Sequence, residues 1–248
     1  MQNKKKVRIF AGPNGSGKST LFVEFSKIYQ TGFFINADFI EKKLFESGFF
    51  NLEEVGLFAS QNDLDNFKNS TDAISLLNKT AKEGHIIDIF VKDNFIVDKS
   101  ISTHSYEGAF IALFIRYLMT LSKKSFSYET VMSHFSKVEE IKYLIQNGYN
   151  AYLYFICVDN HAINISRVQN RIKKGGHSVV EKKIIDRYYR TLENLHLLTP
   201  ICYRAYFFDN SGKQQKLIAE SFNGKLELKI DFLPNWFITY VLPYYIHK

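Results

Sequence analysis

The sequence has only two cysteines among 248 residues, Cys157 and Cys202, and they lie far apart in apolar surroundings. Neither cysteine has the spacing of a metal site, and no disulfide framework is indicated. We therefore expect a reduced, cytoplasmic protein with two buried thiols. Internal repeats and low-complexity tracts are also lacking, so nothing indicates a repeat or disordered architecture.

Hydrophobic runs long enough to cross a bilayer are lacking too. The longest candidate after the N-terminal region, Gly108 to Leu121, is shorter than a membrane span and carries Arg116. Its large apolar residues recur at helical spacing, which predicts a core-facing amphipathic helix. The apolar run behind the N-terminal lysines ends after a few residues, too early for a signal peptide. No membrane partner is expected.

Basic residues exceed acidic ones, giving a net charge of +7 and a pI near 9.1. The excess is spread along the chain, and Lys4-Lys5-Lys6 is the only uninterrupted basic run of three. Such a charge suits an acidic ligand such as a nucleotide or nucleotide sugar. It would also suit nucleic acid, but we do not expect a nucleic-acid partner.

The segment AGPNGSGKST, residues 11–20, matches the phosphate-binding pattern G-x-x-x-x-G-K-[ST] at every defined position. Glycines allow the backbone N–H groups to wrap a polyphosphate, the lysine reaches the terminal phosphates, and the following hydroxyl ligates Mg²⁺. We expect a nucleoside triphosphate to bind here together with Mg²⁺. The predicted nucleotide-binding residues are Gly12, Pro13, Asn14, Gly15, Ser16, Gly17, Lys18, Ser19 and Thr20, with Ser19 also the metal ligand.

Apolar strands alternate with helical patterns along the chain, which predicts an α/β fold with a parallel sheet flanked by helices. With 46% apolar residues, one domain spanning 1–248 is expected, with a helical insertion at about 48–105 after the second strand. The predicted strands are 7–11, 32–36, 126–128, 151–158 and 205–208. The predicted helices are 19–29, 70–82, 162–173 and 180–198, together with one that begins at about 38 and one that ends at about 147. A C-terminal hairpin is expected over 216–230, turning at Asn223-Gly224, with an aromatic tail from Pro234 packed on the body.

Two acidic residues follow predicted strands at the edge where open α/β sheets bind ligands. Asp38 ends the segment FFINAD and could accept the proton of an attacking hydroxyl, or could cap the next helix. Glu129, in SFSYET, could bind a substrate hydroxyl or favour a helix N-terminus. Position alone leaves both pairs of readings open.

Arginines occur in two helical pairs. Arg167 and Arg171 are four residues apart, and Arg187 and Arg190 are three apart, so each pair shares a helix face. With Gly175-Gly176 between the pairs, they could form an arm that brings guanidinium groups onto a triphosphate. Solvated basic faces are the other reading.

Two further residues give weaker signals. His177 follows the two glycines, where a turn or capping role is commoner than catalysis. Asp209, in FDNS, could line a nucleotide site, although Asp-Asn-Ser is also ordinary turn chemistry.

Taken in order, these motifs resemble those of the zeta toxins of bacterial toxin–antitoxin systems. The resemblance rests on GPNGSGKST, INAD, SFSYET, the block RVQNRIKKGGHSVVEKKIIDRYYR and FDNS, which together span most of the chain. It implies a P-loop kinase fold and ATP- and Mg²⁺-dependent phosphorylation of the 3′-hydroxyl of UDP-N-acetylglucosamine or a related UDP-sugar. A small antitoxin is the implied protein partner.

The resemblance also implies residue roles. Lys18 and Ser19 would hold ATP and Mg²⁺, Asp38 would be the catalytic base, and Arg171 with Arg187 would grip the transferring phosphate. The residues expected on the substrate side are Asn36, Glu129, Thr130, Arg167 and Arg190, with Arg167 and Arg190 competing for the phosphate-gripping roles.

The stretch from about residue 48 to 105 is longer than the resemblance predicts and lies where the substrate pocket would be built. The sugar specificity therefore stays open. Two other functions also stay open: a kinase of another small molecule without toxicity, and an ABC-type or nucleic-acid-linked ATPase. GPNGSGKST suits an ABC-type protein, but the sequence has no LSGGQ-type signature.

Overall fold

A computed structural model describes residues 4–100, 105–173 and 179–246. The chain contacts divide it into two compact units, one formed by 1–32 with 127–248 and the other by 33–126. The second unit contains the predicted insertion at 48–105, and the expectation of a single domain stays a prediction. Gly175, Gly176 and His177, and with them the predicted hinge, lie outside the described residues.

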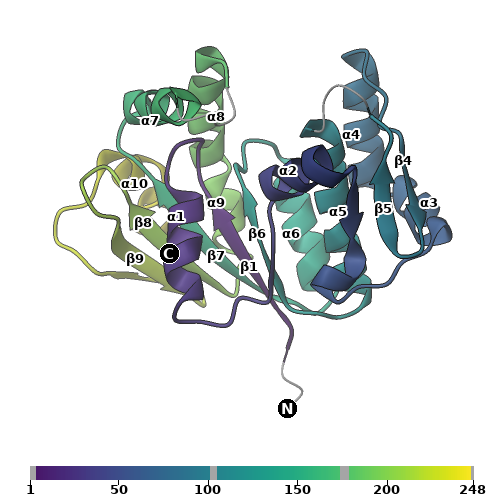
Figure 1. The fold of residues 1–248 in the computed structure, drawn as a ribbon. Helices are drawn as coiled ribbons and strands as arrows, with labels where there is room; N and C mark the ends of the chain where they lie inside the picture. Colours follow the sequence, from purple (N-terminus) through teal and green to yellow (C-terminus); the bar gives the residue numbers. More distant parts are fainter. Residues whose placement is uncertain (1–3, 101–104, 174–178, 247–248) are drawn as a thin grey trace. The chain divides into compact units, whose positions relative to one another are not determined.

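The first unit is built on a largely parallel sheet (Figure 1). Its strands lie in the order β10-β9-β8-β7-β1-β6. Strands β1, β7 and β8 run parallel, and β9 and β10 are added antiparallel. The strand bounds are β1 Lys6–Ala11, β6 Phe126–Thr130, β7 Asn150–Cys157, β8 Arg204–Asp209, β9 Lys216–Phe222 and β10 Lys225–Leu228. The predicted α/β fold with a parallel central sheet is confirmed.

Helices cover both faces of this sheet because alternate strand residues are apolar on each side. Helix α1 packs on the face that carries Phe10, whose ring lies 5.3 Å from that of Phe22. On the other face, Phe207 meets Phe237 of α10 at 5.3 Å. The helix bounds are α1 Lys18–Ser26, α6 Ser136–Gln146, α7 His161–Lys173, α8 Glu181–Glu193, α9 Leu195–Leu198, α10 Asn235–Tyr240 and α11 Pro243–Ile246.

The C-terminal part follows the sequence expectation closely. Strands β9 and β10 form the predicted hairpin, and Asn223 and Gly224 both have positive φ, as a tight hairpin turn requires. The aromatic tail packs on the body, since Trp236 and Phe237 are buried.

Two helices of this unit differ from the bounds that the sequence predicts. Helix α1 stops at Ser26 instead of continuing to Tyr29, and the Ser26 hydroxyl donates to the carbonyl of Val23, a bond that competes with the helical pattern. The helix predicted over 180–198 is divided at Asn194 into α8 and α9.

The second unit combines helices with a small antiparallel sheet in the order β3-β5-β4. Its elements are β2 Phe33–Ile35, α2 Ala37–Ser47, β3 Phe49–Asn51, the 3-10 helix η1 Leu52–Val55, α3 Gln61–Lys68, α4 Thr71–Lys82, β4 Ile89–Lys92, β5 Phe95–Asp98 and α5 Ser105–Leu121. The predicted helical insertion does contain the helices α3 and α4, but the prediction missed three short strands that lie within it. The turn between β4 and β5 uses Asp93 and Asn94 at positive φ without a glycine, which weakens the hairpin signal.

Helix α5 matches the predicted core-facing helix, but its buried surface is broader than one stripe. Phe110, Phe114 and Leu118 are buried as expected, while Ile111 and Ile115 are buried as well and Leu121 is exposed. No helix among the residues with a described structure is long and apolar enough to traverse a bilayer.

Candidate active site

The residues between β1 and α1 form a tight loop in which two positions leave no room for a side chain. Gly12 has φ +149°, and a Cβ there would lie 2.0 Å from the carbonyl oxygen of Ile156. Gly15 has φ +74°, and its Cβ would lie 2.8 Å from the carbonyl oxygen of Asn164. Glycine is therefore required at both positions, for conformation and for space. Helix α1 begins directly behind the loop, with Gly17 at its N-cap.

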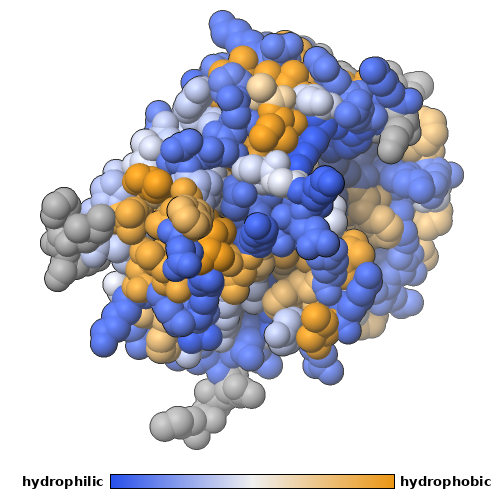
Figure 2. All heavy atoms as spheres, turned by 90° about the vertical axis from the view of Figure 1, so that its left-hand side faces the viewer, coloured by the Kyte–Doolittle hydropathy of each residue, from blue (hydrophilic) through white to orange (hydrophobic). Residues whose placement is uncertain are grey.

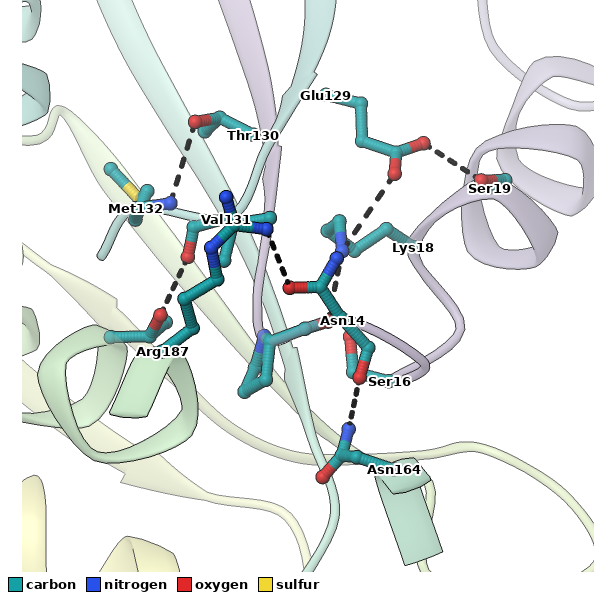
Figure 3. A network of polar contacts seen from close by, with 12 residues as sticks. Asn14, Ser16, Lys18, Ser19, Glu129, Thr130, Val131, Met132, Asn164 and Arg187 are labelled. Atoms are coloured by element: carbon teal, nitrogen blue, oxygen red, sulfur yellow. Dashed lines mark hydrogen bonds and ion pairs between the residues drawn. The ribbon is translucent and has the colours of Figure 1, made fainter. Parts of the chain in front are cut away.

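The two reactive side chains of the loop meet a carboxylate from β6 (Figure 3). The Ser19 hydroxyl donates to Glu129 Oε2 at 2.8 Å, and Lys18 Nζ lies 3.7 Å from Glu129 Oε1. Lys18 is buried and also donates to the carbonyl oxygen of Pro13 at 2.9 Å. A cation, a hydroxyl and a carboxylate thus face one position at the carboxyl end of the sheet.

Asparagines from two neighbouring segments hold the loop backbone. Asn164 of α7 is fully buried and donates through Nδ2 to the carbonyl oxygen of Asn14 at 2.6 Å. Asn210, after β8, donates through Nδ2 to the carbonyl oxygen of Ser16 at 2.8 Å. Neither asparagine was among the predicted site residues, although Asn210 lies in the FDNS motif. No local sequence pattern marks Asn164 as a loop contact.

Of the four predicted arginines, the structure brings Arg167 and Arg187 to the loop. Arg167 donates to the carbonyl oxygens of Asn210, at 2.8 Å, and Gly15, at 3.5 Å. Arg187 donates to Asn14 Oδ1 at 3.2 Å, and its partial burial lowers the pKa of the guanidinium. Arg171 and Arg190 have exposed side chains.

The turn after β8 is held by Asp209. Its Oδ1 accepts hydrogen bonds from the hydroxyl of Ser211, at 2.7 Å, and from the indole Nε1 of Trp236, at 3.0 Å. Asp159, at the end of β7, accepts from the backbone N–H of Trp236 at 3.1 Å. Asp209 therefore stabilises the turn from which Asn210 contacts the phosphate loop.

The other predicted acid, Asp38, lies in the first turn of α2 in the second unit. Its side chain is exposed, and within the described part of the chain it forms no hydrogen bond or ion pair. The capping role is filled by Asn36, whose Oδ1 accepts from the backbone N–H of Phe39 at 3.2 Å. The reading of Asp38 as the N-cap is thereby excluded, while its role as base stays a prediction.

Thr130 and Thr20 have no role that the contacts define. The Thr130 hydroxyl oxygen accepts a long hydrogen bond from the N–H of Met132 at 3.4 Å, and Thr20 is exposed in α1. Both cysteines are free thiols. Cys157 is buried as predicted, whereas Cys202 is only half-buried. Burial raises the pKa of Cys157, and that of Cys202 to about 12, which disfavours the thiolate form of both.

The loop residues fit a polyphosphate. The hydroxyl of Ser16 is fully buried within the loop and has no hydrogen-bond partner among the described residues. Crowding at Gly12 and Gly15 restricts the loop backbone, and glycine-rich loops of this kind bind phosphate through their N–H groups. Ser19 with Glu129 offers oxygen ligands of the kind Mg²⁺ prefers. Among the described residues, no group of three or more histidine, cysteine or acidic side chains could hold a metal ion.

Comparisons with known proteins agree with this fold. No protein-family model matches the chain. An uncharacterised protein of Haemophilus influenzae is 32% identical over 63 residues, which make up 25% of this chain and 45% of that protein. The chain thus matches less than half of this curated relative.

Two solved structures resemble most of the chain. The AvrRxo1-ORF1:AvrRxo1-ORF2 structure with sulphate ions has a TM-score of 0.53 at 13% identity, covering 92% of this chain and 62% of the other. The same pair with ATP gives a TM-score of 0.53 at 15% identity, covering 92% of this chain and 61% of the other. This chain spans about three fifths of those proteins. The fold and the loop define an α/β protein with a phosphate-binding loop between the first strand and helix. At these identities, the likeness establishes the fold alone.

Proposed function

We propose that the chain is an ATP-dependent kinase that phosphorylates a hydroxyl group of a small molecule. The observation that carries the proposal is the contact of Glu129 with both Ser19 Oγ and Lys18 Nζ at the phosphate loop. A loop that only turned the chain would need its glycines but not a lysine, a hydroxyl and a carboxylate directed at one position. This set is the one that phosphoryl transfer requires.

In this function the loop residues hold the donor. The backbone of 12–17 would bind the phosphates, Lys18 would neutralise the terminal ones, and Ser19 with Glu129 would hold Mg²⁺. When bound, ATP supplies the phosphoryl group and Mg²⁺ neutralises charge on its oxygens. The expected sugar contact of Glu129 is replaced in this proposal by a role at the metal, because its carboxylate bonds to the loop hydroxyl.

Two arginines of the first unit would stabilise the charge that spreads over the transferred group. Arg187 suits this role because its guanidinium is partly buried and reaches Asn14 in the loop. Arg167 lies against the carbonyl oxygens of Gly15 and Asn210 and would brace the loop. The roles of Arg171 and Arg190 stay predictions.

Asp38 would accept the proton from the acceptor hydroxyl as that oxygen attacks. Its exposed carboxylate and the capping of α2 by Asn36 support this role, since neither the helix cap nor an ion pair occupies the side chain. Asn36 itself is used in the cap, so a second contact of Asn36 with substrate is a weaker expectation.

For the acceptor we propose a UDP-amino sugar such as UDP-N-acetylglucosamine. Support comes from the ordered motif set around Lys18, Asp38, Glu129 and the two arginine helices, which resembles that of the zeta toxins. A small protein partner that restrains the kinase is part of the same proposal. AvrRxo1-ORF1, whose fold is similar, has been crystallised with a second protein, AvrRxo1-ORF2.

The direct test incubates the purified chain with ATP, Mg²⁺ and a panel of UDP-sugars and follows the products by mass spectrometry. We expect a singly phosphorylated UDP-amino sugar, and none with Lys18→Ala. Phosphorylation of a different alcohol would keep the kinase and overturn the substrate. ATP hydrolysis stimulated by DNA, without a phosphorylated metabolite, would instead favour an ATPase of another class.

A growth assay separates a toxin from a harmless kinase. Expression of the wild-type chain in bacteria should cause lysis if wall synthesis is poisoned, and Asp38→Ala should relieve it. Unimpaired growth with an active kinase would overturn the toxin role while leaving the chemistry in place.

A further inference from the structure

The chain turns sharply just behind Glu129. Strand β6 ends at Thr130, and two residues later Met132 has φ +61°, a left-handed conformation that a large side chain rarely adopts. Met132 is also buried, with 1% of its surface exposed. A buried methionine keeps such a conformation only where the surrounding structure imposes it.

Helix α8 imposes it through two side chains. The Thr191 hydroxyl donates to the carbonyl oxygen of Val131 at 2.7 Å, and Asn194, at the end of α8, donates through Nδ2 to the carbonyl oxygen of Met132 at 3.0 Å. These two carbonyls belong to the peptide units on either side of the Met132 Cα. Thr191 is fully buried, so its hydroxyl bond is shielded from water.

The same helix also reaches the phosphate loop. Arg187 precedes Thr191 by four residues and Asn194 by seven, a spacing that places all three on one side of α8. At one end of this stripe Arg187 donates to Asn14 Oδ1 at 3.2 Å, and at the other end the turn behind Glu129 is held (Figure 3). Helix α8 therefore contacts both the phosphate loop, next to Lys18 and Ser19, and the turn that follows Glu129.

We propose that Thr191 and Asn194 are positioning residues that fix the left-handed Met132 turn and thereby hold the Glu129 carboxylate at Ser19 and Lys18. Without the Thr191 hydroxyl, the peptide before Met132 loses its anchor, the turn relaxes, and the end of β6 loses its register with the loop. As a consequence, the Glu129 carboxylate is held less precisely at Ser19 and Lys18. This inference rests on the proposed function, in which Glu129 acts at Mg²⁺.

The test measures nucleotide binding rather than turnover. Binding of ATP to the full chain is followed by calorimetry with Mg²⁺ and with EDTA in its place, for wild type, Thr191→Val and Thr191→Ser. Valine keeps the shape of threonine and removes the hydroxyl, whereas serine keeps the hydroxyl. We expect Thr191→Val to weaken Mg²⁺-dependent binding about tenfold, to change metal-free binding less than twofold, and Thr191→Ser to behave as wild type.

A matched control separates positioning from general stability. Thr80 of α4 is also a buried threonine, and its hydroxyl donates to the carbonyl oxygen of Leu77 in its own helix. Thr80→Val removes the same group and should lower the thermal midpoint comparably while leaving the Mg²⁺ dependence unchanged. Hydrogen exchange of the Met132 N–H should accelerate in Thr191→Val only.

The outcomes are distinguishable. If Thr191→Val binds ATP with wild-type Mg²⁺ dependence and loses only thermal stability, as Thr80→Val does, the positioning role is overturned. If the wild-type chain binds Mg²⁺ and ATP but phosphorylates no acceptor, the proposed function fails while the Thr191 effect can still be measured. If it binds no nucleotide at all, both fall together.

Discussion

The two compact units differ in the contacts made by their candidate site residues. In the first, bonds from distant parts of the sequence converge on one loop: Glu129, Asn164 and Asn210 contact loop residues that precede them by 110, 150 and 194 positions. In the second, the predicted base Asp38 is exposed and, within the described residues, makes no polar contact. The same unit pairs the fully buried Glu107 with His85, whose side chain is 22% exposed, at 2.7 Å.

The difference shows which half of the proposed reaction the fold prepares in advance. A phosphate group is the same in every ATP-using protein, so the fold can build its contacts permanently, from glycine geometry and bonds to backbone carbonyls. An acceptor hydroxyl differs from one substrate to the next, and a carboxylate left without partners is available to it. Substitutions in the two units should therefore affect different steps.

The largest effect is expected at Lys18. Lys18→Ala removes the buried ammonium group that faces Glu129, and phosphotransfer should fall by roughly 10³-fold or more, since charge stabilisation is lost at the developing charge. ATP affinity should fall as well. Lys27→Ala, at the exposed C-cap of α1, removes the same charge away from the loop and should leave both unchanged. Comparable losses in the two variants would contradict the role of the loop.

Asp38→Asn should separate the units most clearly. It keeps the shape of the side chain but removes the base, so we expect turnover to fall by about 10²- to 10⁴-fold while ATP affinity stays within twofold. The measurement pairs product formation with calorimetry of ATP binding. Glu46→Gln, which neutralises an exposed acid of the same helix, serves as the control. Full turnover in Asp38→Asn would mean that another group takes the proton.

Two glycines with almost the same φ angle provide a test of crowding. Gly15 has φ +74° and Gly84 has φ +77°, but only at Gly15 would a Cβ meet other atoms, with the Asn164 carbonyl oxygen at 2.8 Å. Gly84→Ala should cost only the left-handed strain, about 1 kcal/mol of unfolding free energy. Gly15→Ala should cost more and lower ATP affinity by at least about tenfold. Equal effects in urea unfolding and binding would show that the loop can yield.

The smallest effect on function is expected from His85→Ala. The substitution removes the hydrogen-bond partner of Glu107 Oε1. Because Oε2 already has none among the described residues, a fully buried carboxylate is left without a hydrogen bond there. Unfolding of the second unit should become easier by about 1–3 kcal/mol, with unchanged ATP affinity. Ile86→Ala, at a side chain that is 82% exposed, should change stability by less than about 0.5 kcal/mol. Loss of ATP binding in His85→Ala would show that the units are not separable in this way.

The sequence predicted the strand, loop and helix around Lys18 better than the rest of the candidate site, for a physical reason. Loop, strand and helix are adjacent in the chain, so a local pattern encodes them completely. The contacts of Asn164 and Asn210 join segments that meet only when β7 and β8 align beside β1, and single asparagines carry no periodic signal. The short strand before Asp93 was missed because its turn lacks glycine. The capping role of Asn36 could have been favoured over Asp38 from its position before the first helical turn.

The chain has a single tryptophan, Trp236, and its indole N–H is bonded to the aspartate that begins the turn holding the phosphate loop. The ring is almost fully buried, so its fluorescence reports one defined environment rather than an average over many. The residue after that aspartate, Asn210, grips Ser16 directly. A ligand that rearranges the loop should shift or quench this emission, which gives the unlabelled protein a built-in optical signal for nucleotide binding.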